Sequence, residues 1–199
     1  MDSKNQYFEA MYQKSDDPWD YANRWYEKRK RNICMSVLPK LNFEYVLEIG
    51  CANGFLSEML AERCQKLLCI DANPKAIQLA KQRLQDTHHV EFIQHCIPNQ
   101  FPTGSFDLIV FSEILYYLSK SEVTQCLEKI KTLLSKDGVI LSCHWRYPIE
   151  GFELNGNTVH EILKSELNLY HSLHLNDPDF VLDVWTYHPA TVAQQEGLL

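Results

Sequence analysis

The segment 48–54, with the sequence EIGCANG, has the residue types of a ligand-binding turn. Gly50 permits a backbone turn that a side chain would block, and Gly54 allows a following helix and a ligand to approach the backbone closely. A dinucleotide site would have another glycine at the position of Ala52. Asp71 follows 21 residues after Gly50, where its carboxylate can accept both hydroxyls of a ribose. The pattern favours a ligand with a ribose and an amino-acid tail, although a domain for another nucleotide ligand remains an alternative.

Two further side chains could accept a proton, and each lies at the end of a predicted strand. An amine must be unprotonated to act as a nucleophile, and a carboxylate such as Glu113 or an imidazole such as His144 can accept its proton. Glu113 could instead cap a short helix, and His144 could be a hydrogen-bonded structural histidine. Tyr116 and Tyr117 begin a helix beside Glu113. We assign Glu113, His144 and Tyr116 to the catalytic group, and leave open which tyrosine lines the pocket and which packs in the core.

These residues need a scaffold that brings several strand ends together. Runs of branched apolar residues predict buried strands at 44–50, 66–71, 89–95, 106–112 and 138–145. Helical spacing predicts helices between them at 54–64, 74–85 and 120–134. The alternation indicates the α/β class: a doubly wound, mostly parallel Rossmann-like sheet of six to seven strands with helices on both faces. Ligands bind such sheets at the carboxyl ends of the strands.

The ends of the chain add to this core within a single domain of 199 residues. Two extra N-terminal helices are expected at about 3–14 and 22–37, and a helix near 158–171 and a strand near 180–188 follow the core. We expect residues 1–40 to form a helical lid, 44–145 the cofactor-binding core, and 146–199 a substrate-side segment with the last strand. Whether a final antiparallel hairpin is complete stays open.

The turn at 48–54 and Asp71 resemble motifs I and II of the class I methyltransferases that use S-adenosylmethionine, over residues 44–145. Five blocks across nearly the whole chain also resemble, in order, the NodS-type methyltransferases, a family named for the enzyme that N-methylates the free amine of a nodulation chitooligosaccharide. These blocks are DPWD at 17–20, YEKRK at 26–30, SEILYYL at 112–118, HWR at 144–146 and GNxVH at 156–160.

The resemblance implies that the chain uses S-adenosyl-L-methionine and releases S-adenosyl-L-homocysteine. The methyl acceptor is expected to be a nitrogen, or less readily an oxygen, of a small polar molecule such as an amino sugar or another amine. Methylation of RNA or of a protein, and a cofactor-binding regulator without catalysis, are the alternatives.

The predicted cofactor site combines the turn, the strand ends and the N-terminal helices. Its residues are Trp19, Tyr26, Arg29, Glu48, Gly50, Cys51, Gly54, Asp71, Ala72, Cys96, Ile97 and Ser112. Cys96 stands where this class usually offers an acid to adenine, so backbone groups and Ile97 are expected to serve instead. Arg29 shares a helical stripe with apolar residues and needs a carboxylate, either from the cofactor or from a protein acid. Trp19 and Tyr26 could close over the cofactor.

The acceptor is expected between the loops after the fourth and fifth strands and segment 147–175. The predicted substrate contacts are Tyr117, Trp145, Arg146 and His160. Arg146 could pair with Glu113, bind a substrate oxygen or form a rim ion pair. His160 is expected to face the cleft or to fix the segment that covers it.

Charge is unevenly distributed along the chain. The net charge is −7, and residues 147–199 hold eight acids against one basic residue, Lys164, so the first 146 residues are neutral. This distribution disfavours nucleic acid, whose binding depends on basic residues, and favours a cationic partner unless the acids only aid solubility. Segment 24–31 contains Glu27, so its basic residues are interpreted as a solvated face. No apolar run approaches 18 residues, and the start MDSKNQYFEA has neither the basic head nor the apolar stretch of a signal peptide. We therefore expect a cytoplasmic protein without membrane contact, as a monomer or a dimer.

Two residue groups could suggest metal or redox chemistry. Seven cysteines without a Cys-x-x-Cys pair are interpreted as reduced. His171 and His174 precede Asp177 and Asp179 at spacing that resembles a metal site. Histidines and aspartates in a polar segment are usually unligated, so the sequence predicts no metal site.

Overall fold

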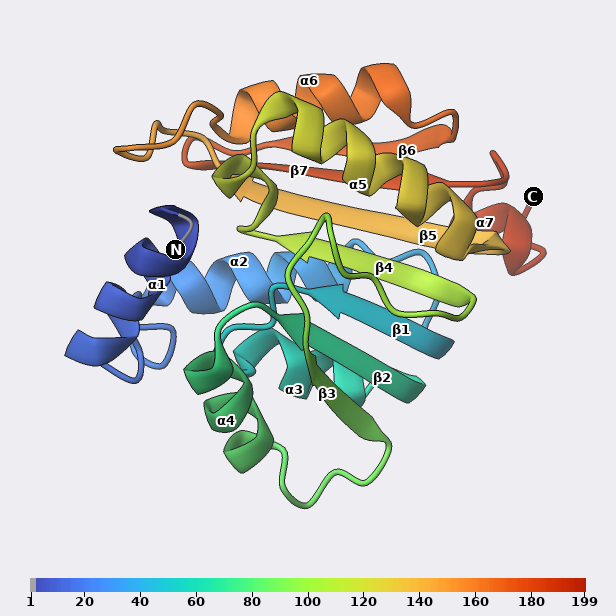
Figure 1. Ribbon diagram of the computed structural model, residues 1–199. Helices are drawn as coiled ribbons and strands as arrows, with labels where there is room; N and C mark the ends of the chain where they lie inside the picture. Colours follow the sequence, from blue (N-terminus) through green and yellow to red (C-terminus); the bar gives the residue numbers. More distant parts are fainter. Residues whose placement is uncertain (1–2) are drawn as a thin grey trace.

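The computed structural model describes residues 3–199 and is built on a seven-stranded sheet (Figure 1). The strand order is β3-β2-β1-β4-β5-β7-β6, and β7 runs antiparallel to both of its neighbours, while the other pairs in the sheet are parallel. The strands are β1 (Phe43–Ile49), β2 (Cys64–Asp71), β3 (Val90–Gln94), β4 (Phe106–Ser112), β5 (Leu134–Trp145), β6 (Tyr170–Asn176) and β7 (Phe180–Thr186). The predicted fold class is confirmed, and the final hairpin is complete.

Helices cover both faces of this sheet. Residues of α2, α3 and α4 share one buried apolar cluster with the sheet, and residues of α5 and α6 share the cluster on the opposite face. The helices are α1 (Ser3–Lys14), α2 (Trp25–Ser36), α3 (Phe55–Ala61), α4 (Pro74–Arg83), the 3-10 helix η1 (Leu115–Tyr117), α5 (Lys120–Leu133), α6 (Gly156–Glu166) and α7 (Val192–Gln195). Across residues 3–199, none of these helices has the length and apolar character needed to span a membrane.

Local sequence explains where several helices begin. Asn73 caps α4 by accepting hydrogen bonds from two backbone N–H groups, and Pro74 follows at the first helical position. Ser119 and Glu122 form a reciprocal capping box at the start of α5. Each cap satisfies backbone donors that a helix leaves unpaired, so these signals set where each helix starts.

The structure corrects one predicted element. The helix expected at 158–171 ends at Glu166, and residues 170–176 form β6 instead. Exposure alternates along β6, and β7 is its sole strand partner in the sheet, so β6 is an edge strand. Pairing with β7 makes this segment a strand rather than a helix, because the polar sequence YHSLHLN has no apolar helical stripe to bury.

Helix α1 lies across the carboxyl ends of the strands (Figure 1). Aromatic contacts hold it there: Tyr7 packs against Phe152 with ring centroids 5.3 Å apart, and Phe8 packs against Tyr117 at 4.7 Å. Lys4 adds an ion pair with Glu122 at 2.6 Å. The N-terminal helices therefore border the edge of the sheet at which ligands of this fold bind.

Candidate active site

A cleft opens over the ends of β1 and β2, where Asp71 is half-buried. The Asp71 carboxylate accepts hydrogen bonds from the backbone N–H of Ala52 at 3.0 Å and of Asn73 at 2.8 Å. Burial raises the pKa of Asp71, and these hydrogen bonds act in the opposite direction. Its acceptor oxygens are suited to a diol. We call this the nucleoside cleft, and its wall also includes Ala72, His95, Cys96, Ile97 and Tyr117.

A second cleft meets the first at Gly50, which lines both. Gly50 has φ +82°, and a side chain there would place its Cβ 3.1 Å from the Cβ of Ile114. Glycine is therefore required both by conformation and by the approach of Ile114. We call this the tail cleft, and its wall includes Glu48, Cys51, Ser112, Tyr21, Arg31 and Glu113.

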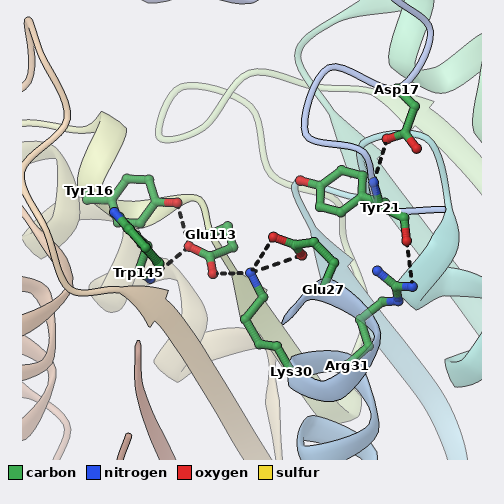
Figure 2. Close-up of polar contacts among 8 residues, drawn as sticks. All are labelled: Asp17, Tyr21, Glu27, Lys30, Arg31, Glu113, Tyr116 and Trp145. Atoms are coloured by element: carbon green, nitrogen blue, oxygen red, sulfur yellow. Dashed lines mark hydrogen bonds and ion pairs between the residues drawn. The ribbon is translucent and has the colours of Figure 1, made fainter. Parts of the chain in front are cut away.

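Arg31 is the cation of the tail cleft with unused donors. Its Nη2 donates to the carbonyl of Tyr21 at 2.9 Å, while Nη1 is buried without a hydrogen-bond partner (Figure 2). Burial lowers the pKa of Arg31, but a guanidinium stays charged at neutral pH. A buried, unpaired N–H is costly, so this geometry suits an anionic group of a ligand.

A larger cavity of about 390 Å³ lies beside the tail cleft. The two spaces share Tyr21, Glu27, Lys30 and Glu113, so a ligand in one is adjacent to a ligand in the other. We call this space the acceptor cavity. Its remaining wall is mainly aromatic, with Tyr7, Trp19, Tyr26, Tyr116 and Trp145 joined by Arg24, Ile149 and Asp179.

Glu113 lies at the junction of these spaces in an unusual conformation. Its φ is +58°, which a non-glycine residue seldom adopts, and its backbone N–H donates to the carbonyl of Cys143. The carboxylate accepts from Tyr116 Oη at 2.5 Å and from the Trp145 N–H at 2.8 Å, and it pairs with Lys30 (Figure 2). Within residues 3–199, Ile114 is the N-cap residue of η1 and no side chain caps that helix, so Glu113 does not act as a helix cap. The strained backbone aims Glu113 into the site.

Lys30 completes this arrangement and was missed by sequence reasoning. It is 3% exposed, and its Nζ lies 2.5 Å from Glu113 Oε1 and 3.1 Å from Glu27 Oε2. Burial lowers the pKa of Lys30, but Glu113 and Glu27 outweigh burial and raise it above its usual value. The sequence feature that could have identified Lys30 is its spacing from Glu27 and Cys34, because these three residues are buried together on α2. The basic cluster at 24–31 is therefore not simply a solvated face.

His144, offered from sequence as an alternative base, is fully buried and lies outside the three spaces. Its Nε2 accepts the backbone N–H of Leu115 at 3.2 Å, and its Nδ1 lies 3.0 Å from His160 Nε2. Burial, followed by the charges of His160 and Lys30, lowers its pKa well below the usual value. The structure thus places His144 as a hydrogen-bonded structural histidine, which was the sequence-based alternative to a base.

His160 likewise does not face the cavity. It is buried between His144 and Asp183, and its Nδ1 bonds to Asp183 Oδ2. Gly156 begins the same helix, and a Cβ there would lie 2.3 Å from the carbonyl oxygen of Trp145. The block GNxVH therefore fastens α6 to the sheet.

Both arginines predicted at the ligand sites are used elsewhere. Arg29 pairs with Asp177 at 2.6 Å and lines neither cleft, so its alternative partner, a protein acid, is the observed one. Arg146 donates to the backbone carbonyl of Asp177 at 2.7 Å rather than to Glu113. Both arginines therefore hold the turn that leads into β7.

Four aromatic or glycine positions also differ in detail from expectation. Trp19 and Tyr26 line the acceptor cavity rather than either cleft, and Tyr117, predicted as a substrate contact, lines the nucleoside cleft. Tyr116, predicted in the catalytic group, lines the acceptor cavity. Gly54 lines none of the three spaces. A Cβ at Gly54 would lie 3.1 Å from the Ala80 Cα, so this glycine allows α3 and α4 to pack closely.

Comparison with known proteins points to one family. The family model described as Nodulation protein S (NodS) matches residues 2–177. The Nodulation protein S of Sinorhizobium fredii is 33% identical over 127 residues, which are 62% of this chain and 58% of that protein. The Rhizobium tropici protein of the same name is 32% identical over 126 residues, which are 62% of this chain and 53% of that protein. The matched region thus spans less than two thirds of these relatives.

Solved structures point to the same family. The N-methyltransferase NodS of Bradyrhizobium japonicum WM9, in complex with S-adenosyl-L-homocysteine, superposes with a TM-score of 0.82 at 26% identity, covering 93% of this chain and 98% of that one. A candidate methyltransferase from Pseudomonas syringae is 42% identical with a TM-score of 0.74, covering 82% of this chain and 99% of that one.

Proposed function

The chain belongs to the NodS family, and from this premise we propose that it is an S-adenosylmethionine-dependent methyltransferase acting on a nitrogen of a small polar molecule. The observation that carries the proposal is the junction at Glu113, where the tail cleft and the acceptor cavity share four residues. Two ligands bound side by side at this junction would meet at a carboxylate. Transfer between bound ligands needs this adjacency.

The residues of the two clefts fit the cofactor. Asp71 supports this, because its acceptor oxygens suit the ribose hydroxyls, and the unpaired Nη1 of Arg31 suits the methionine carboxylate. Gly50 leaves open the corner between them. His95 Nδ1 is buried without a partner beside Cys96, and it supplies a polar contact that the sequence did not suggest for adenine.

When bound, the cofactor supplies a methyl group activated by its sulfonium. The chain must exclude water, orient the acceptor and deal with one proton. Tyr116, Lys30 and the Trp145 N–H hold the Glu113 carboxylate in position at the wall of the cavity. There it can orient an amine and accept its proton, directly or through water.

An amine is favoured by the lining of the acceptor cavity. The acids Glu27, Glu113 and Asp179 face basic Lys30 and Arg24 there, and the aromatic faces attract cations. Of the acids at 147–183 predicted to attract the substrate, Asp179 lines the acceptor cavity, whereas Asp177 is paired with Arg29 and Asp183 with histidines. We propose that the acceptor is a small molecule, because the basic charge that RNA binding requires is not concentrated at this site. The proposed location of the reaction is the cytoplasm.

The experiment combines calorimetry with a transfer assay. S-adenosylhomocysteine should bind the wild-type chain, and Asp71→Ala should weaken binding. Methyl transfer is then measured on glucosamine, a deacetylated chitooligosaccharide, aliphatic amines and an RNA pool. Turnover of an amine supports the proposal. Product binding without turnover of any compound would favour a non-catalytic regulator, and failure to bind the product would refute the cofactor assignment.

A further inference from the structure

Three histidines converge on one buried carboxylate at the sheet edge formed by β6 and β7. Asp183 Oδ1 lies 2.5 Å from His171 Nε2 and 2.7 Å from His174 Nδ1, while Oδ2 bonds to His160. The side chain of Asp183 is 3% exposed, that of His171 is 26% exposed and that of His174 is 53% exposed. The cluster is thus anchored inside the protein and open to solvent on one side.

An irregularity in β6 creates this convergence. His171 pairs with Trp185 and His174 pairs with Asp183, but the register shifts between His171 and Leu173. Residues three apart on a regular strand point to opposite faces, whereas one extra residue places them on the same face. The His171 ring also stacks on Trp185, with centroids 5.2 Å apart and planes 16° apart. Its orientation is therefore set by packing as well as by Asp183.

The donor atoms have the chemistry of a transition-metal site. His171 Nε2, His174 Nδ1 and one Asp183 oxygen lie within 4.8 Å of one another. Two imidazoles and a carboxylate are ligands that suit zinc, whereas magnesium and calcium prefer sites made of oxygen alone. The second Asp183 oxygen is held by His160, which is the outer support that ligating carboxylates usually have.

We propose that His171, His174 and Asp183 form a binding site for a divalent transition-metal ion, with Zn²⁺ as its best-suited occupant. Each imidazole binds as the neutral ring through the named nitrogen and carries its proton on the other one. Solvent completes the coordination on the exposed side of His174. The site lies outside the three spaces of the active site, and the sequence had grouped the two histidines with Asp177 and Asp179, not with Asp183.

The ion would join elements that are distant in sequence. β6 supplies two ligands and β7 the third, and His160 links Asp183 to α6 and to His144 on β5. We therefore expect the ion to stabilise the terminal hairpin against α6 (Figure 1). Its presence is independent of the proposed methyl transfer, because none of its ligands lines a cleft or the cavity.

The test uses the full chain without a histidine tag, freed of metal with chelator and then dialysed. Calorimetry with Zn²⁺ should show one site per chain, Co²⁺ should produce visible d–d absorption, and Zn²⁺ should raise Tm. Two variants probe the ligands: His171→Phe keeps a ring on Trp185, and His174→Ala removes an exposed side chain. Each should weaken Zn²⁺ binding by about 100-fold or more, since loss of an outer-sphere partner alone costs 10–100-fold.

His188→Ala is the matched control, because His188 is an exposed histidine paired with Asp137. It should bind Zn²⁺ like the wild-type chain. The Tm of each metal-free variant shows whether it folds, and S-adenosylhomocysteine binding should be unchanged throughout. The proposal is overturned if the wild-type chain binds no Zn²⁺, or if folded His171→Phe and His174→Ala bind it as tightly as His188→Ala.

Discussion

The ammonium of Lys30 and the carboxylate of Glu113 form a buried ion pair, 2.5 Å apart, that joins α2 to the loop after β4. Through this pair the N-terminal part of the chain contacts the residue proposed to face the acceptor. Trp145 at the end of β5 donates to the same carboxylate. Glu113 therefore connects three separate segments of the site.

Replacing Glu113 with Gln should lower methyl-transfer turnover by about 10² to 10⁴ and leave product binding nearly intact, because the amide keeps the shape but accepts no proton. Single-turnover rates and calorimetry with S-adenosylhomocysteine measure the two effects. Glu128→Gln, on the exposed side of α5, is the control. Loss of product binding would instead move Glu113 into the cofactor site.

Lys30→Met should destabilise the fold by about 3–5 kcal/mol, because Glu27 and Glu113 lose their buried counter-ion. Urea unfolding measures this, and Lys28→Met, exposed on the same helix, should change stability by less than about 0.5 kcal/mol. The double variant Lys30→Met with Glu113→Gln should be less destabilised than the sum of the two single changes. Strict additivity would show that the two groups are not coupled.

Arg31→Gln should weaken binding of S-adenosylhomocysteine by about 10- to 100-fold, the value of a charge-assisted hydrogen bond. Arg29→Gln removes a guanidinium from the same helix that is paired with Asp177, so product affinity should stay near the wild-type value. Calorimetry with S-adenosylhomocysteine measures the affinity of both variants. The opposite ranking would return the carboxylate contact to Arg29, as the sequence had suggested.

Stability should fall as the pH drops below about 6.5. His144 is surrounded by Ser142, His160 and the ring of Tyr116, and its lowered pKa keeps it neutral in the folded chain. The unfolded chain then takes up a proton that the folded chain does not, which costs about 1.4 kcal/mol by pH 5.5 for this group.

Urea unfolding at pH 7.5 and pH 5.5 tests this prediction. His144→Gln should lose less stability between the two values than the wild-type chain. The exposed residue His188 supplies the control variant, His188→Gln, which should keep the wild-type dependence. Equal pH dependence in all three proteins would mean that His144 is not the group responsible.

Much of the fold was predictable because its signals are local. Buried strands appear as apolar runs, and Asn73 and Ser119 mark helix starts through their caps. Strand β6 was not predictable in this way. Its polar residues form a strand because β7, which comes later in the chain, supplies the partner.

In the candidate site, too, some residues could be predicted from the sequence and others could not. Asp71 and Glu113 could be found because each ends a strand or follows one directly, and the topology brings those ends together. Arg31 and Lys30 lie on α2, where the choice between faces depends on how the helix docks. The sequence suggested the face of Arg29, whereas docking buries the face that holds Glu27, Lys30 and Cys34.

The place of β7 in the sheet also affects how the chain folds during synthesis. β6 is made before β7, yet its partner in the sheet is β7, so it cannot join the sheet until residues 180–186 have emerged. Until then β5 presents an unpaired edge, the kind of edge that promotes aggregation. A chain halted before residue 180 would also lack Asp183, so His160 would have no carboxylate to fasten it.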